Sequence, residues 1–363
     1  MVIKSVDALM RQAVSENLFP GGRLLVSHGG EIFFNEAYGL ANIFTGQPVT
    51  RDTLYDLASL TKPLATTLAV MMLIQEEKLC LDQTLSSIIS VLTNTSKADI
   101  QIRHLLTHTS GLPDYRPYYI AISQMPFAYR KDAFKKKIIS EPLVAGIGEQ
   151  CLYSDVGFMI LEWLIELLSG VDLSRYVKEK IYDPLGIKNL FFIAHNQNIP
   201  DRNYAATEIC PWRRILLNGM VHDDNAYVKG GIAGHAGLFG TAESVHAILL
   251  ELLKTFHGKS SKQIFNPDLV QLFFKKNIQQ ERSLGFDVPS PTGSSCGELF
   301  CRDATVGHLG FTGTSFWMDL QQQVIVILLT NRVHPSRNNE RIKEFRPLIH
   351  DQVMKELRWL SPK

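Results

Sequence analysis

The placement of strand-like segments at both ends of the chain constrains its fold more than any other feature. Residues 22–27 and 31–35 are strand-like runs that flank His28-Gly29-Gly30, a pattern typical of a β-hairpin. Residues 312–320 and 323–330 form a second strand-like pair, separated by polar residues. The simplest arrangement is one antiparallel sheet built from both termini. We therefore predict an α+β fold, with a mostly helical region inserted between the strands.

Helices are predicted where apolar residues recur at helical spacing, which they do in residues 6–15, 60–77, 157–169, 242–256 and 340–359. These helices are expected to flank the sheet. We predict one unit over residues 1–363, with a helical part at about 59–274 and a sheet part at about 1–58 and 275–363. Because the sheet needs both ends of the chain, neither half is expected to fold alone.

Composition excludes several classes of protein. The 363 residues include 37 Lys+Arg and 36 Asp+Glu, a net charge of +1, which argues against a nucleic-acid or anionic-membrane surface. No apolar run is long enough to span a bilayer, and the N-terminus lacks the apolar core of a signal peptide. We therefore predict a cytoplasmic protein; a leader trimmed from this sequence would make it periplasmic or secreted. The five cysteines are too scattered for a disulfide framework.

Ser59-Leu60-Thr61-Lys62 is the first motif that can carry chemistry. Ser59 and Lys62 stand three residues apart at the start of a predicted helix, so both side chains can lie on one face. The positive end of the helix dipole favours negative charge that develops beside the serine, and a desolvated lysine can serve as its base. The alternative is a helix-capping serine followed by a solvent-exposed lysine, which explains most chance matches.

Tyr153-Ser154-Asp155 directly precedes the helix predicted from about Gly157. A nearby lysine ammonium favours the phenolate form of a tyrosine, which can then carry a proton from a serine. The alternative for Tyr153 is an ordinary half-buried tyrosine. Asp155 stands where a helix N-cap belongs, so capping and an active-site role are both open for it.

The third motif, residues 307–314, reads Gly-His-Leu-Gly-Phe-Thr-Gly-Thr and leads into the strand that ends near Asp319. Glycines at this spacing let a substrate lie close to a strand edge, where backbone groups can pair with it, so Gly310 is a candidate substrate-binding residue. A dinucleotide site is not indicated, because the chain continues into a strand rather than a helix.

In this order, Ser-x-x-Lys, Tyr-x-Asp about ninety residues later and His-x-Gly before a late strand resemble the serine β-lactamase and penicillin-binding protein superfamily. The tyrosine in the second motif is similar to the class C branch, with its related family VIII esterases and D-amino-acid peptidases. Residues 103–113 and 234–240 also resemble that branch. The resemblance covers about residues 22–331 and implies a β-lactamase/transpeptidase-like fold.

The resemblance also implies roles for individual residues. Ser59 would be the acylated nucleophile, Lys62 its partner and Tyr153 the general base. The backbone N–H groups of Ser59 and Phe311 would form the oxyanion hole, in which each donor is worth about 3 kcal/mol. The implied reaction is acyl transfer to water through a covalent acyl-enzyme, without a metal or other cofactor.

Two departures from the family pattern bear on the substrate. His308 stands where the lactamase motif has lysine, and a histidine with a pKa of about 6.5 is mostly neutral at pH 7, so it would bind a substrate carboxylate less well. Asp155 stands where that pattern has asparagine. If it faces the cleft, it would repel a carboxylate and attract an amine. Both departures favour an esterase or amidase, with Asp155 and His308 as candidate substrate-binding residues.

Two histidine clusters are candidate metal sites. His104 and His108 stand four residues apart, but Leu105 replaces the glutamate of a His-Glu-x-x-His site, so packing and turn formation explain them better. His222-Asp223-Asp224-Asn225 and His235 lack the compact spacing of zinc ligands. We expect residues 221–226 to form one rim of the cleft and His235 to bond within the glycine-rich loop that follows. No metal is predicted.

We therefore predict a serine hydrolase of the class C β-lactamase-like group, which cleaves a small ester or amide through an acyl-enzyme on Ser59. A β-lactamase or D,D-peptidase is the alternative, which the apparent lack of a leader disfavours. A non-catalytic binding protein of the same fold is disfavoured by the intact Ser59, Lys62 and Tyr153. The expected partner is a small-molecule ester, amide or peptide substrate, without nucleic acid or membrane. The sequence leaves the oligomeric state open.

Overall fold

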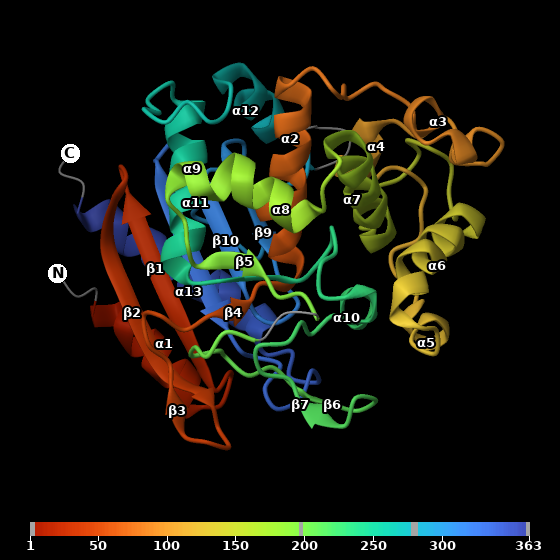
Figure 1. Cartoon of the computed structure of the whole chain (residues 1–363). Coiled ribbons are helices and arrows are strands. Elements are labelled where there is room, and N and C mark those ends of the chain that lie inside the picture. Colours follow the sequence, from red (N-terminus) through yellow and green to blue (C-terminus); the bar gives the residue numbers. More distant parts are fainter. Residues whose placement is uncertain (1–3, 196–198, 277–281, 361–363) are drawn as a thin grey trace.

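The computed structural model describes residues 4–195, 199–276 and 282–360 (Figure 1). Its elements, with 3₁₀ and π turns labelled η, follow in this order: α1 Lys4–Ser15, β1 Gly21–His28, β2 Glu31–Asn42, β3 Gln47–Pro48, β4 Tyr55–Asp56, η1 Ala58–Leu60, η2 Lys62–Thr66, α2 Thr67–Gln75, α3 Leu85–Ile88, η3 Ser90–Leu92, α4 Ile102–Leu106, α5 Tyr119–Ile122, α6 Phe127–Ser140, α7 Asp155–Ser169, α8 Leu173–Val177, η4 Lys178–Tyr182, α9 Asp183–Leu185, β5 Leu190–Phe192, β6 Ile209–Cys210, β7 Ile215–Leu216, α10 Asp224–Lys229, β8 Leu238–Gly240, α11 Ala242–Phe256, α12 Pro267–Phe274, β9 Thr305–Leu309, β10 Ser315–Asp319, β11 Val324–Thr330 and α13 Ile342–Leu360.

The main sheet draws its strands from both ends of the chain, as the sequence predicts. Its six strands lie in the order β3-β2-β1-β11-β10-β9, and each neighbouring pair is antiparallel. The N-terminal β1 pairs directly with the C-terminal β11, in a register that sets Leu25 opposite Ile327. The predicted α+β class and the antiparallel sheet from both termini are therefore confirmed.

Helices cover the main sheet on both faces (Figure 1). Alternate side chains of β1, such as Leu24 and Val26, join the apolar cluster of α1 and α13. Leu25, between them in sequence, belongs to the larger cluster on the other face, which includes α2, α7 and α11. Because β11 is covered on both sides, all seven of its residues are buried. The helical layer on the second face carries the elements that surround the candidate site.

The structure corrects several details of the predicted elements. Strand β9 was not predicted, because Gly307 and His308 interrupt any apolar alternation. The strand expected from residue 312 begins at Ser315, after a turn in which Gly313 has a φ of +107°. The middle region also contains short strands, in the sheets β4-β8-β5 and β6-β7. The helix expected from residue 60 starts as a 3₁₀ turn and a π turn before α2 begins.

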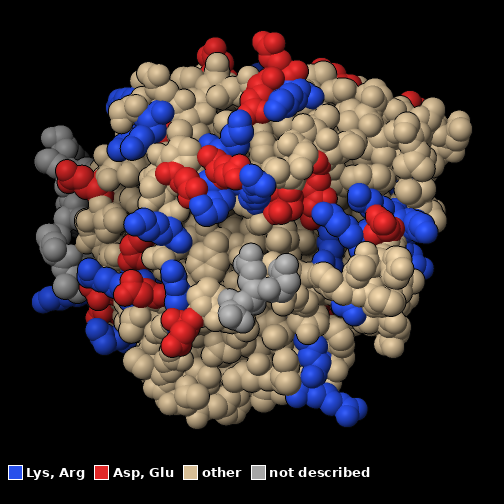
Figure 2. Space-filling view, viewed as in Figure 1, with Lys and Arg blue, Asp and Glu red and all other residues tan. Residues whose placement is uncertain are grey.

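On the face drawn in Figure 2, the described basic and acidic side chains lie intermixed and form no large patch of one charge. Of the helices in the described ranges, none is long and apolar enough to cross a membrane. All five cysteine thiols are free.

Candidate active site

Ser59 lies in a strained turn between β4 and η2. The preceding residue, Ala58, has a φ of +48°, a left-handed conformation that a residue with a β-carbon rarely adopts. The buried carboxylate of Asp56 holds this turn, because its Oδ1 accepts from the Ala58 N–H at 2.9 Å and its Oδ2 from the His222 N–H at 2.6 Å. The turn presents Ser59 at the wall of a cavity.

Lys62 lies on the same face of the turn as Ser59, as their spacing predicts. Its side chain is fully buried, and its Nζ donates to Ser59 Oγ at 3.1 Å and to the carbonyl oxygen of His235 at 3.3 Å. The same Nζ lies 2.7 Å from Asp155 Oδ1. The lysine is therefore a buried cation that contacts both the serine hydroxyl and a carboxylate.

Tyr153 completes this group. Its ring lies 4.5 Å from the ring of His108, and Lys62 Nζ lies 4.7 Å from its centroid. Burial is the largest influence on the pKa of Tyr153 and raises it. Lys62 lowers this pKa and Asp155 raises it, so that the pKa of Tyr153 is raised on balance. Burial lowers the pKa of Lys62, but Asp155 and Tyr153 outweigh burial and the net pKa is raised. In the resting state the pair therefore consists of an ammonium and a neutral phenol.

The structure decides between the two roles left open for Asp155. Ser154, not Asp155, caps α7: its Oγ accepts from the Gly157 N–H at 3.1 Å. Asp155 is the first residue of the helix, which begins two residues earlier than predicted. Its carboxylate is thus free of capping and reaches Lys62 at the cavity wall.

His308 lies on β9, beneath Tyr153, with 6.0 Å between the two ring centroids. Its side chain is buried, and its Nδ1 lies 2.9 Å from the Leu309 carbonyl oxygen. Burial lowers the pKa of His308 to about 4, so the ring is neutral at pH 7. The structure thus sets His308 behind Tyr153 rather than on the cavity wall.

The turn from β9 to β10 sits directly against the Ser59 segment. Thr312 Oγ1 donates to the Asp56 carbonyl oxygen at 2.7 Å, and Thr314 Oγ1 to that of Leu57 at 3.0 Å. These bonds fix the backbone N–H groups of Ser59 and Phe311 relative to each other. Neither N–H donates to any residue in the described part of the chain, so both are available to a developing oxyanion.

Gly310 serves this turn in a different way from the one expected. A β-carbon at Gly310 would lie 2.0 Å from Thr314 Oγ1 and 2.7 Å from the Leu57 carbonyl oxygen. Its own N–H donates to the Thr314 carbonyl oxygen at 2.7 Å. Glycine is required here by the approach of protein atoms, and its N–H, one of the backbone groups expected to be open to a substrate, is bonded within the protein.

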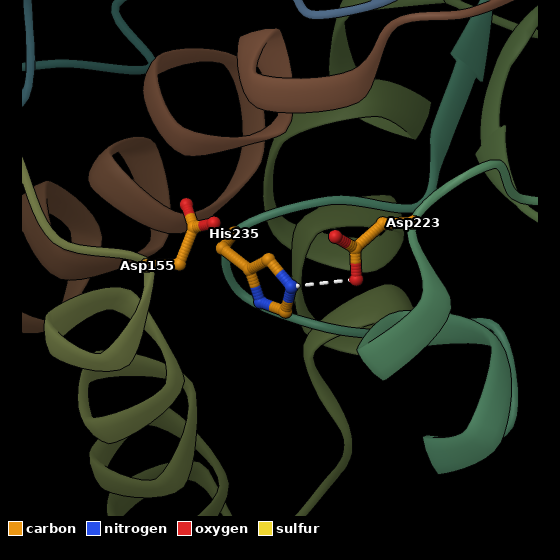
Figure 3. Close-up of side chains that lie close together, drawn as sticks. All are labelled: Asp155, Asp223 and His235. Atoms are coloured by element: carbon orange, nitrogen blue, oxygen red, sulfur yellow. Dashed lines mark hydrogen bonds and ion pairs between the residues drawn. The ribbon is translucent and has the colours of Figure 1, made fainter. Parts of the chain in front are cut away.

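A cavity of about 470 Å³ opens beside Ser59. Its wall includes aromatic side chains (Tyr115, Tyr119, Tyr153 and Phe311), carboxylates (Asp155, Asp223 and Asp224), two histidines (His222 and His235) and Arg337. Residues 222–224 line the cleft, which agrees in part with the rim expected of residues 221–226. His235 differs from expectation, because its Nε2 lies 2.9 Å from Asp223 Oδ1, outside its own loop (Figure 3).

Asp155, Asp223 and His235, the metal-ligating residue types at the site, each have at least one protein partner among the described residues. Single ligand atoms of Asp155, Asp223 and His235 lie within 4.8 Å of one another. However, the Lys62 ammonium is ion-paired with Asp155 and therefore occupies the place that a metal ion would need beside this carboxylate. The earlier histidine pair does not converge: His104 Nδ1 accepts from the Gln101 N–H at 3.1 Å, a capping contact. His108 Nδ1 accepts from the Ser154 N–H at 2.9 Å.

Two neighbours of Tyr153, one a cation and the other a buried histidine, have no signal in the sequence. The guanidinium of Arg282 lies 5.5 Å from the Tyr153 centroid and is ion-paired with Asp287. His108, which stacks on Tyr153, was interpreted only as a packing residue. The segment around Arg282 carries no motif, and it meets Tyr153 only through tertiary folding.

A serine hydroxyl beside a buried lysine and tyrosine, at the edge of an antiparallel sheet built from both termini, defines a serine hydrolase of the β-lactamase and penicillin-binding protein fold. The comparison with known families agrees, because residues 6–349 match the Beta-lactamase family. The chain belongs to this family.

One curated relative and two solved structures that resemble the chain fit this assignment. A protein of Escherichia coli K12, provisionally named D-alanyl-D-alanine carboxypeptidase, is 31% identical over 360 residues, covering 92% of this chain and 82% of the relative. Among solved structures, the hydrolase EstCE1, described as having promiscuous acyltransferase activity, has a TM-score of 0.72 at 22% identity, covering 95% of this chain and 98% of that one. An octameric penicillin-binding protein homologue from Pyrococcus abyssi has a TM-score of 0.73 at 21% identity, covering 99% and 77%.

Proposed function

We propose that this protein hydrolyses a small ester or amide through an acyl-enzyme on Ser59. The observation that carries the proposal is the 3.1 Å contact between Lys62 Nζ and Ser59 Oγ at the wall of the cavity. A hydroxyl is a weak nucleophile unless a neighbouring group takes its proton. In this proposal Tyr153, as phenolate, takes the proton, and the Lys62 ammonium beside its ring supports that step.

In the proposed reaction, Tyr153 first loses its phenol proton to solvent. Ser59 Oγ then attacks the substrate carbonyl while the Tyr153 phenolate takes the hydroxyl proton. The Lys62 ammonium stabilises that phenolate. The N–H groups of Ser59 and Phe311 bind the oxyanion, which then collapses as the bond to the leaving group breaks. The leaving alcohol or amine takes the proton from Tyr153. Water attacks the acyl-enzyme by the same route, and this releases the acid and restores the Ser59 hydroxyl.

A D,D-peptidase is the second candidate, and it is favoured by the name of the 31% identical relatives. Such a substrate ends in a carboxylate. His308, which replaces the motif lysine, is buried and neutral, so it supplies no charge to such a group. For this reason we place an ester or amide first and a D,D-peptidase or β-lactamase second.

The proposal is tested by incubating the protein with a fluorophosphonate, a short-chain p-nitrophenyl ester and a penicillin, followed by intact-mass measurement and peptide mapping. We expect an adduct on Ser59 and ester turnover, and we expect Ser59→Ala to lose both. A lasting penicillin adduct or penicillin hydrolysis would favour the second candidate. If folded protein gives no adduct with any of the three, the chain is a binding protein of this fold and the proposal is wrong.

A further inference from the structure

We propose that the cleft binds the protonated amino group of its substrate between Asp155 and Asp223, so that the preferred substrates are esters, amides or peptides of amino acids with a free amino group. This inference rests on the proposed function, and it names the substrate class. It would set the protein apart from an enzyme that recognises the free carboxylate at the other end of a peptide.

Asp155 stands at the start of α7 and Asp223 just before α10, and the ring of His235 lies between them in the view of Figure 3. Ligand oxygens of Asp155 and Asp223 lie within 4.8 Å of each other. An ammonium donates to a carboxylate oxygen at about 2.8 Å, so one ammonium can contact both. Their side chains remain 19% and 22% exposed, which leaves them accessible to a ligand.

Asp223 is the carboxylate with spare capacity. Its Oδ1 accepts from the Ala226 N–H at 2.7 Å and contacts His235 Nε2, whereas Oδ2 has no donor among the described residues. Burial raises the pKa of Asp223, but the interactions with His235 and the Ala226 N–H outweigh burial and hold the pKa below its usual range. The group is therefore an anion at neutral pH, with one oxygen unsatisfied.

The cations described at the cleft, in contrast, are each paired with a carboxylate other than Asp223. Lys62 pairs with Asp155, and Arg337 Nε donates to Glu208 at 2.7 Å. Arg213 lies 2.7 Å from Asp224. Within the described residues at this wall, Asp223 alone has only an imidazole as its side-chain partner, and a neutral imidazole can make that bond. Among the described residues, a substrate cation therefore finds an anion with a free oxygen, whereas each cation named here already has a carboxylate partner.

The wall of the cavity offers further acceptors. His235 is 2% exposed and its Nδ1 has no partner in the described part of the chain. With Nε2–H donated to Asp223, Nδ1 is an acceptor that an incoming N–H group can satisfy. Tyr115 lines the same cavity. The pKa of Tyr115 is raised, first by burial and then by the nearby carboxylates Asp223, Asp224 and Asp155. Its hydroxyl is therefore neutral, and its ring lies near these carboxylates. An aromatic ring beside carboxylates favours cations.

The position of this pair relative to Ser59 selects an α-amino group. A single ammonium, that of Lys62, contacts both Ser59 Oγ and Asp155 Oδ1. Only the Lys62 ammonium therefore separates Asp155, the nearer carboxylate of the pair, from the attacking oxygen of Ser59. In an amino acid derivative the amino nitrogen is two bonds from the carbonyl carbon, so it reaches Asp155 while the carbonyl meets Ser59.

The test compares kcat/KM for alanine p-nitroanilide and N-acetylalanine p-nitroanilide, in both enantiomers. Losing a charge-assisted hydrogen bond typically costs a factor of about ten or more, so we expect at least a tenfold preference for the free amine. Asp223→Asn should reduce this ratio severalfold, and asparagine retains the N-cap of α10. Asp82→Asn, at a side chain that is 70% exposed, is the matched control and should leave the ratio unchanged.

A second measurement does not depend on anilide turnover. Alaninamide should protect Ser59 from fluorophosphonate labelling at a lower concentration than N-acetylalaninamide does. Equal protection and equal kcat/KM for the two forms would overturn the amine site, while labelled Ser59 would leave the proposed function standing. If Ser59 is not labelled at all and neither anilide is turned over, both proposals are wrong.

Discussion

Helix α7 forms two buried ion pairs with lysines, and they differ in what surrounds them. Asp155, at its start, pairs with Lys62, and Glu162, seven residues later, pairs with Lys229. Seven residues are about two helical turns, so both carboxylates lie on one face of the helix. Both pairs also hold the same loop, because Glu162 Oε2 accepts from the Gly234 N–H at 2.9 Å and Lys62 donates to the next carbonyl oxygen.

A cavity borders each pair, so a cavity does not distinguish them. The one beside Glu162 and Lys229 has a volume of about 290 Å³, and none of its described lining residues carries a hydroxyl or thiol. Lys62, in contrast, contacts Ser59 Oγ. The comparison teaches that a buried lysine–carboxylate pair is not in itself a sign of catalysis. Under the proposed function, the serine hydroxyl within reach of Lys62 distinguishes a pair with a chemical role from a structural pair.

The largest effect is expected from removing the two lysines in turn. Lys62→Ala should lower the rate of Ser59 acylation by about 10³-fold or more, because the group that stabilises the base is lost. Lys229→Ala should leave kcat/KM for a p-nitrophenyl ester within about threefold of the wild type. Circular dichroism would verify that both variants are folded. Full activity in Lys62→Ala would contradict the proposed proton path.

The free energy of unfolding should fall more in Lys229→Ala than in Lys62→Ala, the reverse of the order expected for activity. Glu162 is 1% exposed, so Lys229→Ala leaves a carboxylate buried without its partner, at a cost of about 3 kcal/mol or more in the free energy of unfolding. Asp155 is 19% exposed, and water can solvate it when Lys62 is replaced. Chemical denaturation of the two variants would measure the difference. Equal losses of stability would mean that the two pairs are not distinguished by burial.

The parts of the fold that the sequence predicts are those with a clear period. The hairpin β1-β2, the strands β10 and β11 and the helix that ends before Gly170 all follow from apolar spacing. Strand β9 does not, because a glycine and a buried polar histidine occupy its middle. Strands β4, β5 and β8 have only two or three residues, too few for any period to be visible.

The candidate site likewise contains residues that the local sequence predicts and contacts that it does not. Ser59, Lys62 and Tyr153 could be proposed from motifs whose residues are neighbours in sequence. Whether Asp155 caps α7 or faces Lys62 could not, because it depends on Ser154 taking the cap one residue earlier. Arg282 approaches Tyr153 only because β9 and the segment before it fold against the helical layer. A contact of that kind has no local signal in the chain.

The smallest effect, and the sharpest separation of the two pairs, is expected in the pH dependence. Asp155 raises the pKa of Lys62 and also that of Tyr153, which must lose its proton before it can take one from Ser59. The rate of ester hydrolysis should therefore rise with pH. Asp155→Asn removes a negative charge, lowers both pKa values and moves the rising limb toward lower pH, with a severalfold higher rate at a pH on that limb.

The control is Glu162→Gln, two turns along the same helix and remote from Ser59, which should leave the rising limb in place. A neutral substrate such as p-nitrophenyl acetate keeps amine recognition out of the measurement. A limb that does not move in Asp155→Asn would mean that Asp155 does not control the proton of the base, and that its pair is as structural as the pair of Glu162.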